Sequence, residues 1–86
     1  MSPYFVAFCW QSGGGEARVG FTAPRALGKA VVRNRMRRRV RETIRRRLWR
    51  VAPGWWIVFN LRKACLDAPQ HELDAAVDRV VAQCAS

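Results

Sequence analysis

Apolar and polar positions divide the chain into segments with the periods of strands and helices. Residues 4–10, YFVAFCW, are aromatic and β-branched, and residues 17–23, ARVGFTA, place apolar side chains at alternate positions. Both patterns predict strands. The glycine-rich stretch between them, residues 11–16, is typical of a turn. We therefore expect the first two strands to form an antiparallel hairpin.

The C-terminal half of the chain predicts one more strand and an amphipathic helix. Residues 55–61, WWIVFNL, are apolar on both faces, as in a strand that is buried on both sides. Apolar residues then recur at helical spacing in a final segment. They are Leu73, Ala76, Val77, Val80, Val81 and Cys84.

Residues 31–50, VVRNRMRRRVRETIRRRLWR, combine a helical apolar stripe with dense positive charge. The apolar positions recur every four residues, at Val32, Met36, Val40, Ile44 and Leu48. This spacing predicts a helix that packs one face on a sheet. The opposite side of the helix carries Asn34, Arg35, Arg38, Arg39, Arg41, Glu42, Arg45, Arg46 and Trp49. Arg33, Arg37 and Arg47 fall within the apolar stripe. We therefore expect them to lie at the ends of the helix or to extend their charged groups past the edge of the stripe into solvent.

The element order is therefore strand, strand, helix, strand, helix. It predicts an α+β domain in which a small sheet of three to four strands packs with two helices. The 86 residues suffice for one domain, residues 1–86, and for no second core.

The net charge of +10 changes this picture, because it predicts a polyanionic partner. Nucleic acid is the first candidate and an anionic membrane surface is the second. Charged helix faces usually mix both signs, whereas Glu42 is the sole acid on the predicted arginine helix. The repulsion between the arginines therefore indicates a partner that neutralises them. RNA is favoured over DNA, because the apolar stripe commits the helix to the sheet and the aromatic strands suit unpaired bases.

No catalytic or metal-binding constellation is visible in the sequence. Cys9, Cys65 and Cys84 are widely spaced, and His71 is the one histidine. This pattern favours buried thiols in a reducing compartment over a disulfide framework or a zinc site. No signal peptide or membrane-spanning segment is predicted, so we expect a cytoplasmic protein.

Residues 20–46, GFTAPRALGKAVVRNRMRRRVRETIRR, resemble the signature of the protein component of bacterial ribonuclease P. The shared features are a Gly-Phe strand end, a basic loop and the run Gly-Lys-Ala-Val-x-Arg-Asn-Arg. The resemblance implies an RNA-binding subunit that assists a catalytic RNA in removing the 5′ leader from precursor tRNA. It also implies that hydrolysis and its Mg²⁺ ions belong to the RNA, and that the protein binds no cofactor or metal itself.

The resemblance also implies most of the residues that contact RNA, and the arginine helix adds Arg45. The predicted RNA-binding set is Arg25, Lys29, Arg33, Asn34, Arg35, Arg37, Arg38, Arg41 and Arg45. Val6 and Phe8 fall where the first strand of the family lines the cleft for the leader. The partners implied are the catalytic RNA and precursor tRNA, with no membrane.

This chain differs from the family pattern in two places along its sequence and at its start. The family also implies an unusual topology. Pro24-Arg25-Ala26 replaces the usual Ser-Lys-Lys loop, and Arg39 stands where the family usually has an apolar residue. Family members normally begin with a basic, aromatic-bearing helix, and we interpret this chain as a domain that lacks it. The family further implies a left-handed crossover from the second strand through the arginine helix to the third, against the right-handed rule.

Two other functions remain open from the sequence. A structural RNA-binding protein of the ribosomal type would carry the same basic helix without a role in cleavage. A basic amphipathic helix could also bind a membrane or a regulatory protein through its apolar stripe.

Overall fold

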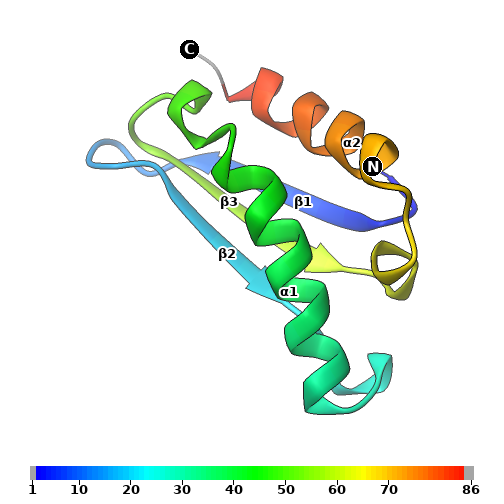
Figure 1. Cartoon of the computed structure of the whole chain (residues 1–86). Coiled ribbons are helices and arrows are strands. Elements are labelled where there is room, and N and C mark those ends of the chain that lie inside the picture. The colour runs from blue at the N-terminus through cyan, green and yellow to red at the C-terminus, as the bar shows by residue number, and fades with distance from the viewer. Residues whose placement is uncertain (1, 85–86) are drawn as a thin grey trace.

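The computed structural model describes residues 2–84, which form three strands and two α-helices. The strands are β1 (Phe5–Gln11), β2 (Arg18–Thr22) and β3 (Trp55–Leu61), and the helices are α1 (Ala30–Arg45) and α2 (Gln70–Gln83). Short 3₁₀ helices lie before α1, before β3 and before α2. The predicted element order and the α+β class are confirmed (Figure 1).

The predicted hairpin of the first two strands is wrong, because β3 lies between them. β1 pairs with β3 in the antiparallel sense and β2 pairs with β3 in the parallel sense, which gives the order β1-β3-β2. β3 is the most apolar strand, and its central position gives its backbone hydrogen-bonding partners on both edges. A β1–β2 hairpin would have left this strand at an edge.

The glycine-rich loop after β1 carries the chain past the start of β3 instead of turning it back. The backbone N–H of Ser12 donates to the carbonyl of Gly54 (2.7 Å), and the N–H of Gly54 donates to the carbonyl of Gly15 (2.8 Å). Gly13 and Gly15 have φ angles of 93° and 84°, which residues with a Cβ rarely adopt. The glycines therefore shape a crossing loop, which the sequence pattern does not distinguish from a hairpin turn.

The crossover from β2 through α1 to β3 is left-handed, as the family resemblance implies. In Figure 1, α1 lies in front of the sheet, β2 and the parallel β3 run toward the lower right, and β3 lies to the upper right of β2. When the strands are turned to point upward with the helix toward the viewer, β3 lies to the left of β2. About 98% of such crossovers are right-handed, so general topology rules would choose the wrong hand here.

The core lies between the sheet and the two helices. α1 contributes Met36, Val40 and Ile44, which are buried as their four-residue spacing predicts. Burial of such side chains contributes roughly 1.5–3 kcal/mol each, which fixes the side of α1 that faces the sheet. The stripe is shorter than predicted, because α1 ends at Arg45 and Leu48 lies exposed in the 3₁₀ helix Leu48–Arg50.

β3 and α2 complete this core. The ring of Phe59 packs edge-on against Phe5 (centroids 4.9 Å apart) and stacks on Phe21 (5.6 Å). α2 buries Leu73, Ala76, Val77, Val80 and Val81, the stripe predicted from sequence. Among the described helices, none combines the length and hydropathy that a membrane span requires.

Candidate nucleic-acid interface

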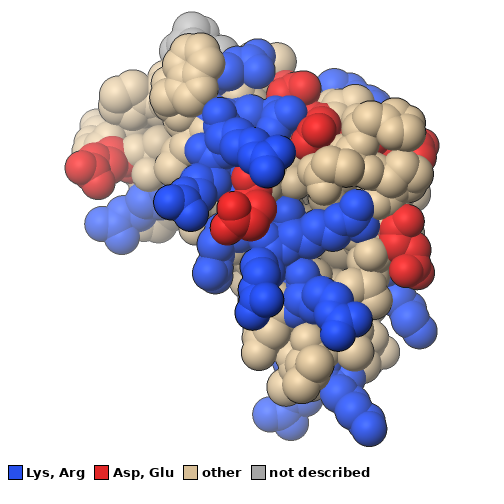
Figure 2. All heavy atoms as spheres, in the orientation of Figure 1, with Lys and Arg blue, Asp and Glu red and all other residues tan. Residues whose placement is uncertain are grey.

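The outward side of α1 carries a continuous set of exposed arginines. The buried residues Met36, Val40 and Ile44 fix the orientation of the helix, so residues half a turn away point to solvent. Figure 2 shows lysine and arginine side chains gathered over this side of the molecule. The exposed arginines, which we call the arginine face, are Arg35, Arg38, Arg41, Arg45 and Arg46.

Little negative charge offsets the arginine face. Glu42 is the sole acid on α1, and its carboxylate lies 3.8 Å from the guanidinium of Arg45 with both side chains largely exposed. Exposed ion pairs of this kind contribute about 0–1 kcal/mol. Arg35, Arg38 and Arg41 are neighbours at helical spacing and repel one another. This uncompensated face is the electrostatic footprint of a site for a polyanion.

The structure brings most of the predicted RNA-binding residues to this side or to its N-terminal end. Arg25 lies exposed on the 3₁₀ helix Arg25–Leu27, and the exposed Lys29 is the N-cap residue of α1. Together they extend the positive surface past the start of the helix. Exposed on α1 itself are Asn34, Arg35, Arg38, Arg41 and Arg45.

Arg33 and Arg37 lie on the flank of α1 rather than on the arginine face. Both are half-buried. The Arg33 guanidinium donates to the carbonyl of Ala23 (3.5 Å), just after β2, and its buried Nε has no partner within residues 2–84. Arg37 donates to Oδ1 of Asn34 (3.0 Å). These hydrogen bonds explain how Arg33 and Arg37 are accommodated within the apolar stripe of the helix.

Arg39 does not belong to the arginine face, so the prediction for this residue is wrong. Its guanidinium donates to the carbonyls of Cys65 (3.0 Å), Leu66 (2.9 Å) and Ala68. These carbonyls lie at the end of the 3₁₀ helix Lys63–Leu66 and in the turn that leads to α2. Arg39 therefore satisfies backbone acceptors that an apolar residue at this position could not reach.

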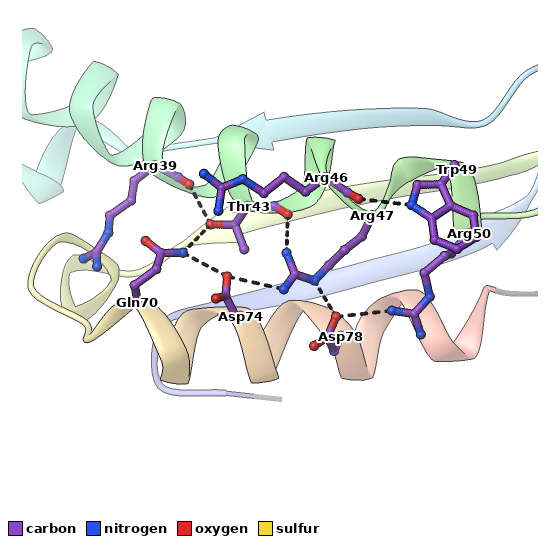
Figure 3. Close-up of polar contacts among 9 residues, drawn as sticks. All are labelled: Arg39, Thr43, Arg46, Arg47, Trp49, Arg50, Gln70, Asp74 and Asp78. Carbon is purple, nitrogen blue, oxygen red and sulfur yellow. Dashed lines mark hydrogen bonds and ion pairs between the residues drawn. The ribbon is translucent and has the colours of Figure 1, made fainter.

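Arg47 also has a structural role, shown in Figure 3. Its guanidinium donates to the carbonyl of Thr43 (2.9 Å), lies 3.4 Å from the Asp74 carboxylate and bonds Asp78. Arg50 lies 3.4 Å from the same Asp78 carboxylate. Asp74 and Asp78 of α2 thus neutralise Arg47 and Arg50, and within residues 2–84 the arginine face is paired only with Glu42.

The face of the sheet opposite the helices is a second candidate surface. Val6 and Phe8 lie on it, opposite Asn60 and Val58 in the β1–β3 register. Phe8 is 53% exposed, which is unusual for a phenylalanine on a strand. This face of the sheet is apolar at Val6 and Phe8, and neither α1 nor α2 covers it (Figure 1).

Three residues of this face were not singled out from the sequence. Trp10 and Trp56 are cross-strand partners with ring centroids 5.9 Å apart. Arg18 of β2 pairs with Trp56 in the register, and its guanidinium carbon lies 5.8 Å from the Trp56 ring centroid. Strand alternation could have placed Trp10 beside Phe8, but the contribution of β2 depends on the parallel pairing that the hairpin prediction missed.

No metal-binding cluster is found in the part of the chain that the structure describes. Within residues 2–84, no three or more His, Cys, Asp or Glu side chains gather at a site that could hold a metal ion. Both candidate surfaces are instead built for binding, one by charge and the other by aromatic side chains.

Comparison with known proteins agrees with the resemblance seen in the sequence. Residues 1–85 match the family described as Ribonuclease P. The chain is 52% identical over 71 residues to the Ribonuclease P protein component of Symbiobacterium thermophilum, which covers 81% of this chain and 61% of that protein. It is 46% identical over 66 residues to the same component of Roseiflexus castenholzii, covering 76% of this chain and 54% of that protein. The chain thus spans less than two thirds of the length of these relatives.

The fold has a solved counterpart in the RNase P protein from Thermotoga maritima. The TM-score is 0.81 at 26% sequence identity, and the match covers 96% of this chain and 79% of that one. Sequence match, fold and the arginine-bearing crossover helix agree, and the chain belongs to the ribonuclease P protein family.

Proposed function

We propose that this chain is the RNA-binding protein subunit of ribonuclease P and assists a catalytic RNA in removing the 5′ leader from precursor tRNA. The observation that carries the proposal is the arginine face of α1, which exposes five arginines beside the lone acid Glu42. Family membership supplies the RNA to which this surface is assigned. The site of action would be the cytoplasm.

The mechanism is electrostatic. A guanidinium forks onto phosphate oxygens, and each phosphate that is neutralised releases counterions. Neutralisation by the arginine face lets RNA helices approach one another with fewer metal ions, while phosphate contacts set the orientation of the protein on the RNA. Hydrolysis and its Mg²⁺ ions belong to the RNA in this proposal, and the chain holds no cofactor.

The open face of the sheet is the proposed contact for the single-stranded leader. Unpaired bases stack on aromatic side chains, and each stacked base contributes about 1–3 kcal/mol. Phe8 is exposed for such a contact, and Val6 lies two residues away on the same face. The two surfaces lie on opposite sides of the sheet, so catalytic RNA and leader can be bound together.

Reconstitution of cleavage tests this function. The purified chain is added to the catalytic RNA of ribonuclease P at a magnesium concentration too low for the RNA alone, with precursor tRNA as substrate. We expect cleavage to be restored by the wild-type chain and lost in the double variant Arg35→Gln/Arg38→Gln. An RNA-binding protein of the ribosomal type would bind the RNA without restoring cleavage, and that result would refute the proposal.

A further inference from the structure

Trp49 is the most exposed of the large hydrophobic side chains in residues 2–84. It lies in the 3₁₀ helix Leu48–Arg50, directly after the C-terminal end of α1, and is 82% exposed. Tryptophan is rarely left so open in a folded domain, because burial of its large ring is strongly favourable. Packing in the core therefore does not explain why a tryptophan stands at this position.

The indole is held in place although its ring is open to solvent. Its Nε1–H donates to the carbonyl of Arg46 (3.2 Å), one of the carbonyls that the end of α1 leaves without a helical partner (Figure 3). The cation–π contacts within the described chain involve Trp56 and Phe21, and its aromatic pairs do not include Trp49. The ring thus has a fixed edge and an unoccupied face, which lowers the entropy cost of a stacking contact.

Arginines flank Trp49 in the sequence. Arg45 and Arg46 precede it and belong to the arginine face, and Arg50 follows it. Within residues 2–84, no hydrogen bond or ion pair occupies the Arg46 guanidinium, whereas Arg50 lies near Asp78. Trp49 therefore lies just past the C-terminal end of the arginine face, and the side chain of Arg46 points away from its ring (Figure 3).

We propose that Trp49 is a stacking site for an unpaired RNA base next to the phosphates held by the arginine face. Every base presents a π-face, but a base inside a duplex is already stacked on both sides, so the site selects loops, bulges or single strands. The surrounding arginines favour RNA over an apolar protein surface. This inference rests on the proposed RNA-binding function and adds a contact outside the predicted RNA-binding residues.

The test compares Trp49→Ala, Trp49→Phe and Val31→Ala on three RNAs. The RNAs are the catalytic RNA of ribonuclease P, a 12-nucleotide single strand and a blunt duplex of the same sequence. Val31 is the matched control, because it is 68% exposed near the other end of α1 and has no ring to stack. Urea unfolding of each variant checks the fold, and its midpoint should stay close to the wild-type value, because both side chains are exposed and water can replace the indole as donor to the Arg46 carbonyl.

We expect Trp49→Ala to weaken binding to the catalytic RNA and to the single strand by about 5- to 100-fold. Trp49→Phe should recover most of this loss, and Val31→Ala should change affinity less than about 2-fold. The slope of log affinity against log salt should not change in Trp49→Ala, since stacking releases no counterions. Binding to the blunt duplex should be nearly unaffected.

Three results would overturn the inference. They are a loss in Trp49→Ala below 2-fold, an equal loss on duplex and single strand, and a loss that follows a shallower salt slope. Failure of the proposed function can be told apart from failure of the stacking site. In the first case the wild-type chain would bind the catalytic RNA weakly and would not restore cleavage. A wild-type chain that restores cleavage with a Trp49→Ala variant of equal affinity would refute the stacking site alone.

Discussion

The guanidinium of Arg47 lies 3.4 Å from the carboxylate of Asp74 and thereby joins the end of α1 to α2. The Arg47 side chain is 17% exposed and also bonds Asp78 and the backbone of Thr43. Its neighbour Arg46 is exposed and belongs to the arginine face. Adjacent arginines therefore differ: one connects two helices, and the other is exposed on the arginine face.

This difference predicts opposite effects of the same substitution. Arg47→Gln should lower the free energy of unfolding by about 1.5–3 kcal/mol, because hydrogen bonds of a charged group are lost and Asp74 loses its ion-pair partner, while Asp78 keeps Arg50. Arg46→Gln should change it by no more than about 0.5 kcal/mol and should weaken RNA binding instead. Urea denaturation followed by circular dichroism measures the first quantity, and a binding titration measures the second. Equal destabilisation by the two substitutions would contradict the assigned roles.

Arg39 gives a second stability prediction. Arg39→Leu restores the residue type that the family usually has here, yet it should lower the free energy of unfolding by about 2–3 kcal/mol. The reason is that the carbonyls of Cys65, Leu66 and Ala68 lose their donor in a partly buried turn. Arg38→Leu, one residue earlier on the exposed face, is the matched control and should leave stability nearly unchanged. A more stable Arg39→Leu variant would show that the apolar contact outweighs these hydrogen bonds.

The roles of Arg39 and Arg47 mark the limit of prediction from sequence. Helical periodicity correctly placed Met36, Val40 and Ile44 in the core, because a four-residue repeat fixes one side of a helix whatever it packs against. The destination of a long guanidinium depends on which backbone or carboxylate groups the fold brings near it. Those groups come from segments some thirty residues away, so no local pattern reports them.

The sheet illustrates the same limit at the level of strands. Alternation along β1 places Val6 and Phe8 on the face opposite the buried Phe5, because side chains alternate strictly along a strand. It carries no information on which strands become neighbours, and sequence proximity favoured a hairpin that β3 prevents. The left-handed crossover was predicted from the family resemblance alone.

The buried thiol of Cys65 should make the free energy of unfolding depend on pH. Burial raises the pKa of its thiol to about 11, while the nearby Arg39 guanidinium acts in the opposite direction. Between about pH 9 and 11 the unfolded chain loses this proton and the folded chain keeps it. The contribution to stability is therefore complete below about pH 9 and is lost as the pH rises toward 11.

The measurement is the urea midpoint of the wild-type chain and of Cys65→Ala from pH 8 to pH 10.5. The wild-type midpoint should fall across this range, and the fall should be smaller in Cys65→Ala. Some pH dependence will remain, because burial also raises the pKa of the Cys84 thiol to about 12. Parallel curves for the two chains would show that Cys65 does not contribute.

The arginine face predicts a steep dependence of RNA affinity on salt. If about six phosphates are neutralised, affinity for the catalytic RNA should fall roughly 10³-fold between 50 and 200 mM salt. Arg38→Gln/Arg41→Gln should reduce the slope of log affinity against log salt by about 2, since two phosphate contacts are removed. Affinity that persists almost unchanged in molar salt would refute the electrostatic mechanism.

Phe8 distinguishes leader recognition from binding of the catalytic RNA. Its side chain is exposed on the open sheet face, so Phe8→Ala should leave the fold and the affinity for the catalytic RNA nearly unchanged. If Phe8 stacks on a leader base, the substitution should lower the affinity of the assembled enzyme for precursor tRNA by about 5-fold or more. Mature tRNA, which has no leader, should bind equally well to both enzymes and serves as the internal control. A loss of the same size for both substrates would assign Phe8 to another contact and leave the open face without its proposed ligand.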